Sequence, residues 1–150
     1  MKIKGILIAV AWFACASTAV YAKQLVIVTD KNSATTNLKA SDLANIFNAH
    51  TRTWQDGKTI QIVMRDPSTE DAQLALRRIL NMTTDQARAF VQAHRGVIIV
   101  ADSDDAILHF VATNRGSIGV VDLYSLTKDV QVIKIDGKLP LEPGYLLKGN

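Results

Sequence analysis

The sequence of 150 residues contains a single cysteine, Cys15. One cysteine cannot form a disulfide within the chain or supply the ligands of an iron–sulfur cluster, so both are excluded. If the N-terminal segment that carries Cys15 is removed, a cysteine nucleophile is excluded as well. We therefore expect no function that depends on sulfur chemistry.

The sequence also lacks a strong charge of either sign and the common motifs of catalysis. Without Lys2 and Lys4 the basic and acidic residues nearly balance, and no lysine or arginine run predicts a nucleic-acid or anionic-membrane partner. There is no Gly-x-Ser-x-Gly elbow, P-loop or dinucleotide fingerprint. The three histidines do not have the spacing of a metal site. We expect no enzyme, no cofactor, no metal and no nucleic-acid partner.

The N-terminus has the three-part pattern of a secretory signal. Lys2 and Lys4 are followed by an uncharged, mostly apolar stretch over residues 5–16, and then by small residues with Val20 and Ala22 at the cleavage positions. This pattern predicts a signal peptide over residues 1–22 and a periplasmic domain over residues 23–150. An uncleaved anchor is disfavoured because a bilayer span needs about 20 apolar residues. Lipid attachment at Cys15 is a second alternative.

The rest of the chain alternates short apolar runs with helical patterns. Apolar runs bounded by turn residues predict strands, and apolar residues at helical spacing behind Ser or Thr caps predict helices. The tail over residues 136–150 is rich in proline and glycine and is predicted to be irregular. The predicted strands cover residues 25–28, 59–64, 97–100, 118–121 and 130–135. The predicted helices begin at Ser41, at Ser68 or Thr69, at Thr83 and at Ser103.

This alternation of strands and amphipathic helices predicts an α/β fold with a mainly parallel sheet flanked by helices. Residues 23–150 suit one compact domain with a single core. In such folds ligands bind where strands end and helices begin, at the carboxyl edge of the sheet. Binding residues are therefore expected at the ends of the predicted strands.

The second predicted strand ends at Arg65 and leads through Asp66 into a helix start that contains Ser68 and Thr69. Free backbone N–H groups at a helix start attract an anion, and Arg65 and the two hydroxyls add further donors. The alternative is plain helix capping with Arg65 solvated. Glu70, whose charge opposes an anion, favours that alternative.

A second polar loop follows the first predicted strand and contains Ser33, Thr35 and Thr36. In a parallel sheet this loop lies at the same edge as Arg65, where its hydroxyls and amides supply further donors. The alternative is a surface turn without a ligand. The sequence thus predicts one anion site assembled from two strand ends.

Four segments, taken in order, resemble the phosphate-type substrate-binding proteins of ABC uptake systems. Residues 41–47 (SDLANIF), 53–57 (TWQDG), 60–65 (IQIVMR) and 107–121, which contain the family-like GSIGVV, follow that family's progression. The resemblance covers about residues 25–121. It implies a periplasmic-binding-protein fold of type II, a phosphate-like oxyanion ligand near Arg65 and Asp66, and a membrane transporter as partner.

The same comparison shows where this chain departs from the family pattern. The family follows its arginine with a Ser-Gly-Thr turn around the anion, whereas this chain reads Pro67, Ser68 and Thr69 and has no glycine there. Two hypotheses follow. The first is a periplasmic binder of phosphate or a similar oxyanion, with Arg65, Asp66, Ser68, Thr69, Ser33, Thr35 and Thr36 at its site. The second is a ligand-free module that docks on an envelope transporter or sensor.

Overall fold

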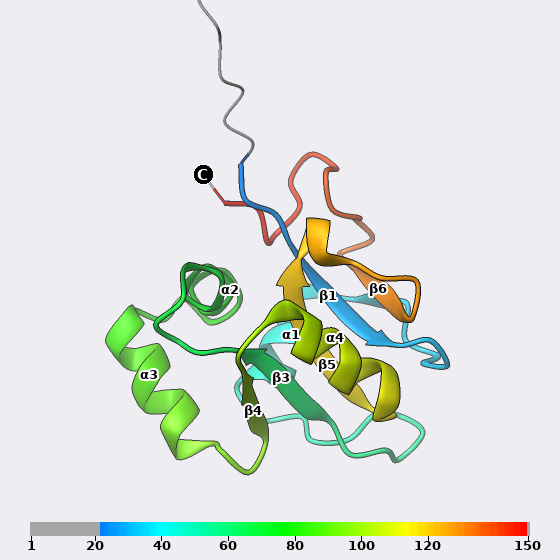
Figure 1. Ribbon diagram of the computed structural model, residues 1–150, viewed down its shortest axis with the longest axis horizontal. Coiled ribbons are helices and arrows are strands. Elements are labelled where there is room, and N and C mark those ends of the chain that lie inside the picture. The colour runs from blue at the N-terminus through cyan, green and yellow to red at the C-terminus, as the bar shows by residue number, and fades with distance from the viewer. Residues whose placement is uncertain (1–21, 150) are drawn as a thin grey trace, which may run out of the picture.

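The computed structural model describes residues 22–149, so the predicted signal peptide and Cys15 lie almost entirely outside the described residues. The described chain forms one six-stranded sheet, in the order β2-β6-β1-β5-β3-β4, and four α-helices (Figure 1). The strands are β1 (Leu25–Asp30), β2 (Asn37–Leu38), β3 (Gln61–Arg65), β4 (Ile98–Ala101), β5 (Ser117–Asp122) and β6 (Val130–Ile135). The helices are α1 (Ala40–Phe47), α2 (Glu70–Leu80), α3 (Thr84–Ala93) and α4 (Asp104–Thr113), with a 3₁₀ turn, η1 (Leu123–Ser125), after β5.

The sheet is the middle layer of three, as the pattern of burial along β1 shows. All six residues of β1 are buried, because both faces of the sheet are covered. Val26 and Val28 pack with Ile107 of α4 on one face. Leu25 and Ile27 belong to the larger core on the other face, with α1, α2 and α3. The predicted α/β fold with flanking helices is confirmed.

The sheet contains three parallel and two antiparallel pairs of strands. β3 is parallel to both β4 and β5, as a strand–helix–strand connection requires. β1 is different, because it is antiparallel to both of its neighbours, β5 and β6. The C-terminal end of β1 therefore lies at the sheet edge opposite to the C-terminal ends of β3 and β5.

The helix starts follow the predicted caps at two of four places. Thr83 forms a capping box with Gln86 at the start of α3, and Ser103 caps α4 by accepting the amide of Ala106. The prediction of Ser41 as a cap is wrong, because α1 begins after Lys39, which gives no side-chain cap. For α2 the cap is Thr69 rather than Ser68.

The C-terminal tail is irregular, as predicted, but it closes the core. The amide of Leu25 donates to the carbonyl of Leu147 at 3.0 Å, and the amide of Gly149 donates to that of Lys23 at 2.6 Å. Tyr145 and Leu147 are buried in the larger core. Within residues 22–149, no helix has both the length and the apolar character needed to cross a membrane.

Tyr145 gives a direct test of this packing. Its hydroxyl is buried without a hydrogen-bond partner among the described residues, and burial raises the pKa of the phenol well above its ordinary value. We expect Tyr145→Phe to raise the free energy of unfolding at pH 7 by about 1 kcal/mol, because it removes an unsatisfied polar group. Above pH 10 the phenol of Tyr145 ionises in the unfolded chain, whereas its raised pKa keeps it neutral in the folded protein, so wild type loses stability. Tyr145→Phe has no phenol at this position, so its stability should fall less as the pH rises.

Thermal denaturation at pH 7 and pH 11 measures both effects. Tyr124→Phe, at an exposed position, serves as the control and leaves both values unchanged. A lower melting temperature for Tyr145→Phe than for wild type contradicts the proposed burial of an unpaired hydroxyl.

Candidate functional site

Arg65 is the last residue of β3 and lies at the edge where α4 and α2 begin. Its Nη1 lies 3.6 Å from Oδ1 of Asp104, the first residue of α4, and its side chain remains 30 % exposed. That distance is too long for a hydrogen bond, and Oδ1 of Asp104 is buried without one. The guanidinium is therefore held by electrostatic attraction to the carboxylate of Asp104, and it stays partly exposed to solvent.

The second oxygen of Asp104 ties this edge together. Its Oδ2 accepts hydrogen bonds from the amide of Asp122, at 2.9 Å, and from the hydroxyl of Ser125, at 2.8 Å. Asp104 thus joins the start of α4, the end of β5 and η1, and it places a carboxylate beside Arg65. Any anion that approaches Arg65 competes with this internal carboxylate.

The start of α2 is also partnered from within the chain. Oδ1 of Asp66 accepts a hydrogen bond from the amide of Ser68 at 2.8 Å. The hydroxyl of Thr69 donates to the carbonyl of Asp66 at 2.7 Å. The same hydroxyl oxygen of Thr69 accepts a hydrogen bond from the amide of Ala72 at 3.3 Å. The hydroxyl and the amide of Ser68 lower the pKa of Asp66 below its ordinary value. The carboxylate of Asp66 therefore occupies the place that an anion needs at the Ser68 amide.

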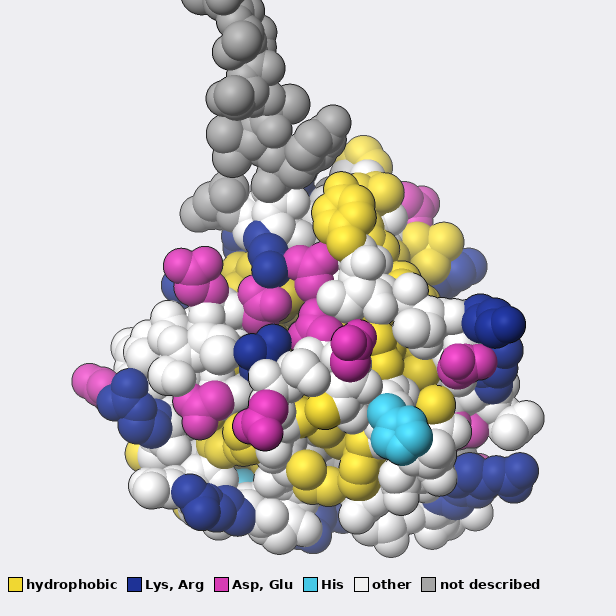
Figure 2. Space-filling model, viewed as in Figure 1, with side chains coloured by type: hydrophobic (Ala, Val, Ile, Leu, Met, Phe, Trp, Pro, Cys, Tyr) yellow, Lys and Arg dark blue, Asp and Glu magenta, His cyan; other side chains and the backbone are white. Residues whose placement is uncertain are grey.

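Acidic side chains dominate the surroundings of Arg65. Figure 2 shows them gathered in the middle of this face, with basic side chains between them. Lys23 bridges Asp71 of α2 at 3.0 Å and Asp122 of β5 at 2.9 Å. These carboxylates, above all the hydrogen bond to Asp122, raise the pKa of Lys23. Arg65 and Lys23 are thus already paired, and a free anion gains less here than beside an unpaired arginine.

The loop that contains Ser33, Thr35 and Thr36 does not reach Arg65. β1 is antiparallel to β5, with Thr29 opposite Ile118, so this loop lies near the beginning of β5, whereas Arg65 lies near its end. At about 3.3 Å per residue, a strand of this length separates the two edges by roughly 17 Å. The predicted shared edge is wrong, because a strand–helix alternation does not reveal that β1 pairs with late strands of opposite direction.

Instead, the loop lines a hollow of about 340 Å³ at its own edge. The hollow lies between the loop that follows β1, the turn at Trp54–Lys58 and the start of β5. Ser33 and Thr35 line it, whereas Thr36 lines an adjoining hollow of about 490 Å³ with Thr35. The remaining lining residues of the first hollow are Asp30, Ala34, Trp54, Gln55, Asp56, Lys58, Gly116 and Ser117.

Sequence reasoning missed this hollow. It identified residues 54–58 as a turn, which the hydrogen bond from the Gly57 amide to the carbonyl of Trp54 confirms, but assigned them no role at a site. The one available signal was a tryptophan in an otherwise polar turn. Within residues 22–149, no group of three His, Cys, Asp or Glu side chains is arranged to hold a metal ion.

Comparison with known proteins gives matches among solved structures only. No protein-family model matches the sequence. No curated protein matches it either. An ABC-type phosphate transport receptor from Vibrio cholerae is similar with a TM-score of 0.73 and 19 % identity, over 86 % of this chain and 55 % of that chain. PstS from Borrelia burgdorferi is similar with a TM-score of 0.72 and 21 % identity, over 87 % and 56 %.

A phosphate binding protein from Stenotrophomonas maltophilia is also similar, with a TM-score of 0.64 and 18 % identity over 78 % of this chain and 40 % of that chain. The chain has the fold of these solved structures. It spans about half the length of the first two, 55 % and 56 %. The chain therefore has the fold that its resemblance to phosphate-type binding proteins implied.

The internal partner at α2 gives a test with a pH signature. We expect Asp66→Ala to lower the free energy of unfolding at pH 7 by roughly 0.5 kcal/mol, a small value because solvent screens this exposed group. A carboxylate whose folded-state pKa is lowered stabilises the fold above its unfolded-state pKa, and this stabilisation is lost as the pH falls. The difference between the two proteins should therefore shrink as the pH falls through the lowered folded-state pKa of Asp66.

Denaturant unfolding at pH 7 and at low pH measures this difference. Asp66→Asn keeps an oxygen acceptor for the Ser68 amide and should lose less stability than Asp66→Ala at pH 7. An equal loss at both pH values argues that the carboxylate does not act as a charged partner of the helix start.

Proposed function

We propose that this protein is an exported solute-binding protein for an ABC uptake system, and that it binds phosphate or a similar small oxyanion with Arg65. The observation that carries the proposal is the position of Arg65, at the end of β3 and beside the start of α2, in a fold shared with phosphate-binding proteins. Export would follow cleavage after Ala22. An exported product that begins at Lys23 in N-terminal sequencing supports it, and one that keeps residues 1–22 argues against it.

The contacts of Arg65 suit an arginine that exchanges partners. Its ion pair with Asp104 is long, and nearly a third of its side chain is exposed. A tetrahedral oxyanion accepts two parallel N–H donors from one guanidinium and is held more strongly than by a single contact. If Asp66 swings away, the hydroxyl and the amide of Ser68 supply further donors.

Ser33, Thr35 and Thr36 are not part of this proposed site, because they lie at the opposite edge of the sheet. The remaining donors face two carboxylates, Asp66 and Asp104, which compete with the ligand. The site is also open to solvent, which weakens each ionic contact. We therefore expect millimolar rather than micromolar affinity for inorganic phosphate.

Removing the competing charge should strengthen binding. We expect Asp104→Asn to tighten phosphate binding about tenfold, because it removes a negative charge beside Arg65 and keeps an oxygen for the amide of Asp122 and the hydroxyl of Ser125. Arg65→Gln should abolish binding. Isothermal titration with phosphate, repeated at two salt concentrations, measures both effects.

Asp56→Asn is the matched control. Like Asp66, Asp56 accepts a hydrogen bond from the backbone amide two residues further on, here that of Lys58. Asp56 differs because it lies at the opposite edge of the sheet. It should leave phosphate affinity unchanged. If wild type and Asp104→Asn both fail to bind millimolar phosphate, the proposed oxyanion function is wrong.

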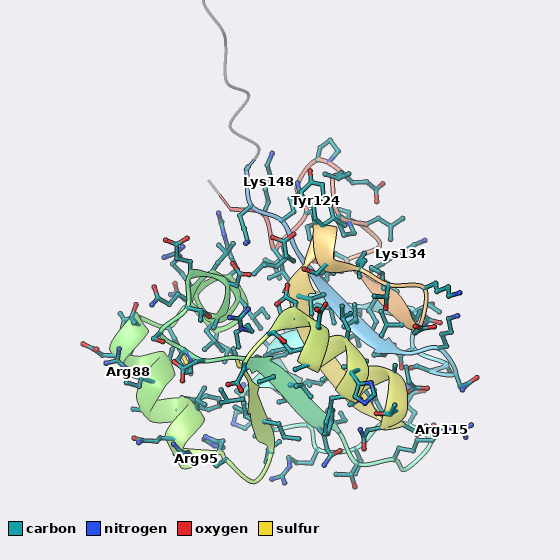
Figure 3. The ribbon with its side chains drawn as sticks, viewed as in Figure 1. Arg88, Arg95, Arg115, Tyr124, Lys134 and Lys148 are labelled. Atoms are coloured by element: carbon teal, nitrogen blue, oxygen red, sulfur yellow. The ribbon has the colours of Figure 1, made fainter. Side chains whose placement is uncertain are left out.

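A ligand-free docking module is the second candidate, and the internal pairing of Arg65 and of the Ser68 amide favours it. Three large apolar side chains offer a surface for docking: Tyr124 is 76 %, Leu141 69 % and Leu139 42 % exposed. Figure 3 shows Tyr124 close to the C-terminal tail. For this candidate we expect an envelope transporter or sensor to co-purify with wild type and not with Tyr124→Asp. Recovery of the free protein alone from envelope extracts contradicts it.

A further inference from the structure

The two hollows beside Trp54 form one groove at the sheet edge opposite to Arg65. Both are lined by Ala34, Thr35, Trp54 and Gln55. Their volumes of about 340 and 490 Å³ lie within the range of sites for small organic ligands, about 300–1,000 Å³. The proposed oxyanion site does not use this groove.

The wall of the groove is fixed by three segments that are distant in sequence. The Gly116 amide donates to Oδ2 of Asp30 at 3.2 Å, and Nε1 of Trp54 donates to the carbonyl of Gly116 at 2.9 Å. Gly116 has a φ of +88°, and a Cβ there would lie 2.7 Å from the carbonyl oxygen of Thr59. The indole is therefore held in one orientation by a peptide group that only glycine accommodates.

The charged groups of the first hollow, Asp30, Asp56 and Lys58, already have partners. Lys58 forms an ion pair with Asp56. Asp30 is only 5 % exposed, and its carboxylate accepts the amides of Asn32 and Gly116. The first hollow thus carries two carboxylates and one ammonium, and its small excess of negative charge disfavours an anion. Arg115 precedes Gly116 but is exposed, and Figure 3 shows it at the rim of the molecule.

In the first hollow, the polar groups that remain available are neutral. The hydroxyl of Thr35 and the side-chain amide of Gln55 form no hydrogen bond with other described residues, and together they offer donors and acceptors. Trp54 adds a flat, half-buried aromatic surface. The second hollow continues this lining with hydroxyl and amide groups of Thr36, Asn37, Thr51 and Thr53.

We propose that this groove is a second binding site, and that it takes a neutral polyhydroxylated ligand of the saccharide class. The hydroxyl groups of a sugar donate to and accept from Thr35 and Gln55, and its C–H surface packs against the indole of Trp54. Among the described residues, the first hollow, where Trp54, Thr35 and Gln55 meet, holds no unpaired charge, and the exposed carboxylate of Asp42 at the second hollow disfavours phosphate.

The fluorescence emission of Trp54 can report ligand binding in the groove that contains this residue. The sequence has two tryptophans, so Trp12→Phe in the full-length chain leaves Trp54 as the only one. We expect cellobiose or N,N′-diacetylchitobiose to change the emission of Trp54 in a saturable manner at millimolar concentration or below. Gln55→Ala and, separately, Thr35→Val should each weaken this binding at least fivefold.

Two controls separate this site from others. Gln92→Ala, on α3, should leave saccharide binding unchanged. Arg65→Gln should also leave it unchanged, so the result of the saccharide experiment does not depend on the result of the phosphate experiment. Spermidine and inorganic phosphate should cause no saturable change in Trp54 emission. The proposal is overturned if neither saccharide gives saturation, if spermidine or phosphate binds as well, or if Gln55→Ala and Thr35→Val both bind like the parent.

Discussion

The direction of β1 decides which loops of this protein lie at the same edge of the sheet. β1 lies between β5 and β6 and is antiparallel to both, so its end and the end of β3 are at opposite edges of the sheet. The polar loop after β1 is thereby separated from Arg65 and placed beside Trp54. The molecule has two polar edges with different chemistry, one with paired charges and one with mainly neutral groups.

At the edge that contains Arg65, charged and polar groups of the chain pair with one another. Asp104 faces the guanidinium while it holds the end of β5, and Asp66 accepts the amide of Ser68. Each carboxylate stabilises local structure and at the same time competes with an external anion. For the proposed oxyanion site, this means that the groups that order the edge also compete with the ligand.

The sequence predicted local features better than distant ones. The caps Thr83 and Ser103 were predictable because a cap depends on residues three positions apart. The strands were predictable as apolar runs, but β1 is buried on both faces, so its pattern carries no information on neighbours or direction. Asp104 as the partner of Arg65, and Asp30 and Gly116 around Trp54, depend on contacts between distant segments and could not be predicted from spacing.

β1 pairs with strands that are far from it in the sequence, and this separation affects how the chain folds. The contact between Asp30 and Gly116 joins residues 86 positions apart, and the tail residues that cover β1 come later still. Contacts of this range form slowly, because a large loop must close first. During synthesis the apolar β1 thus emerges well before β5 and β6 and stays without these partners until both strands are made. Such a segment is prone to aggregate, so production of this protein should depend on chaperones that protect its first strand.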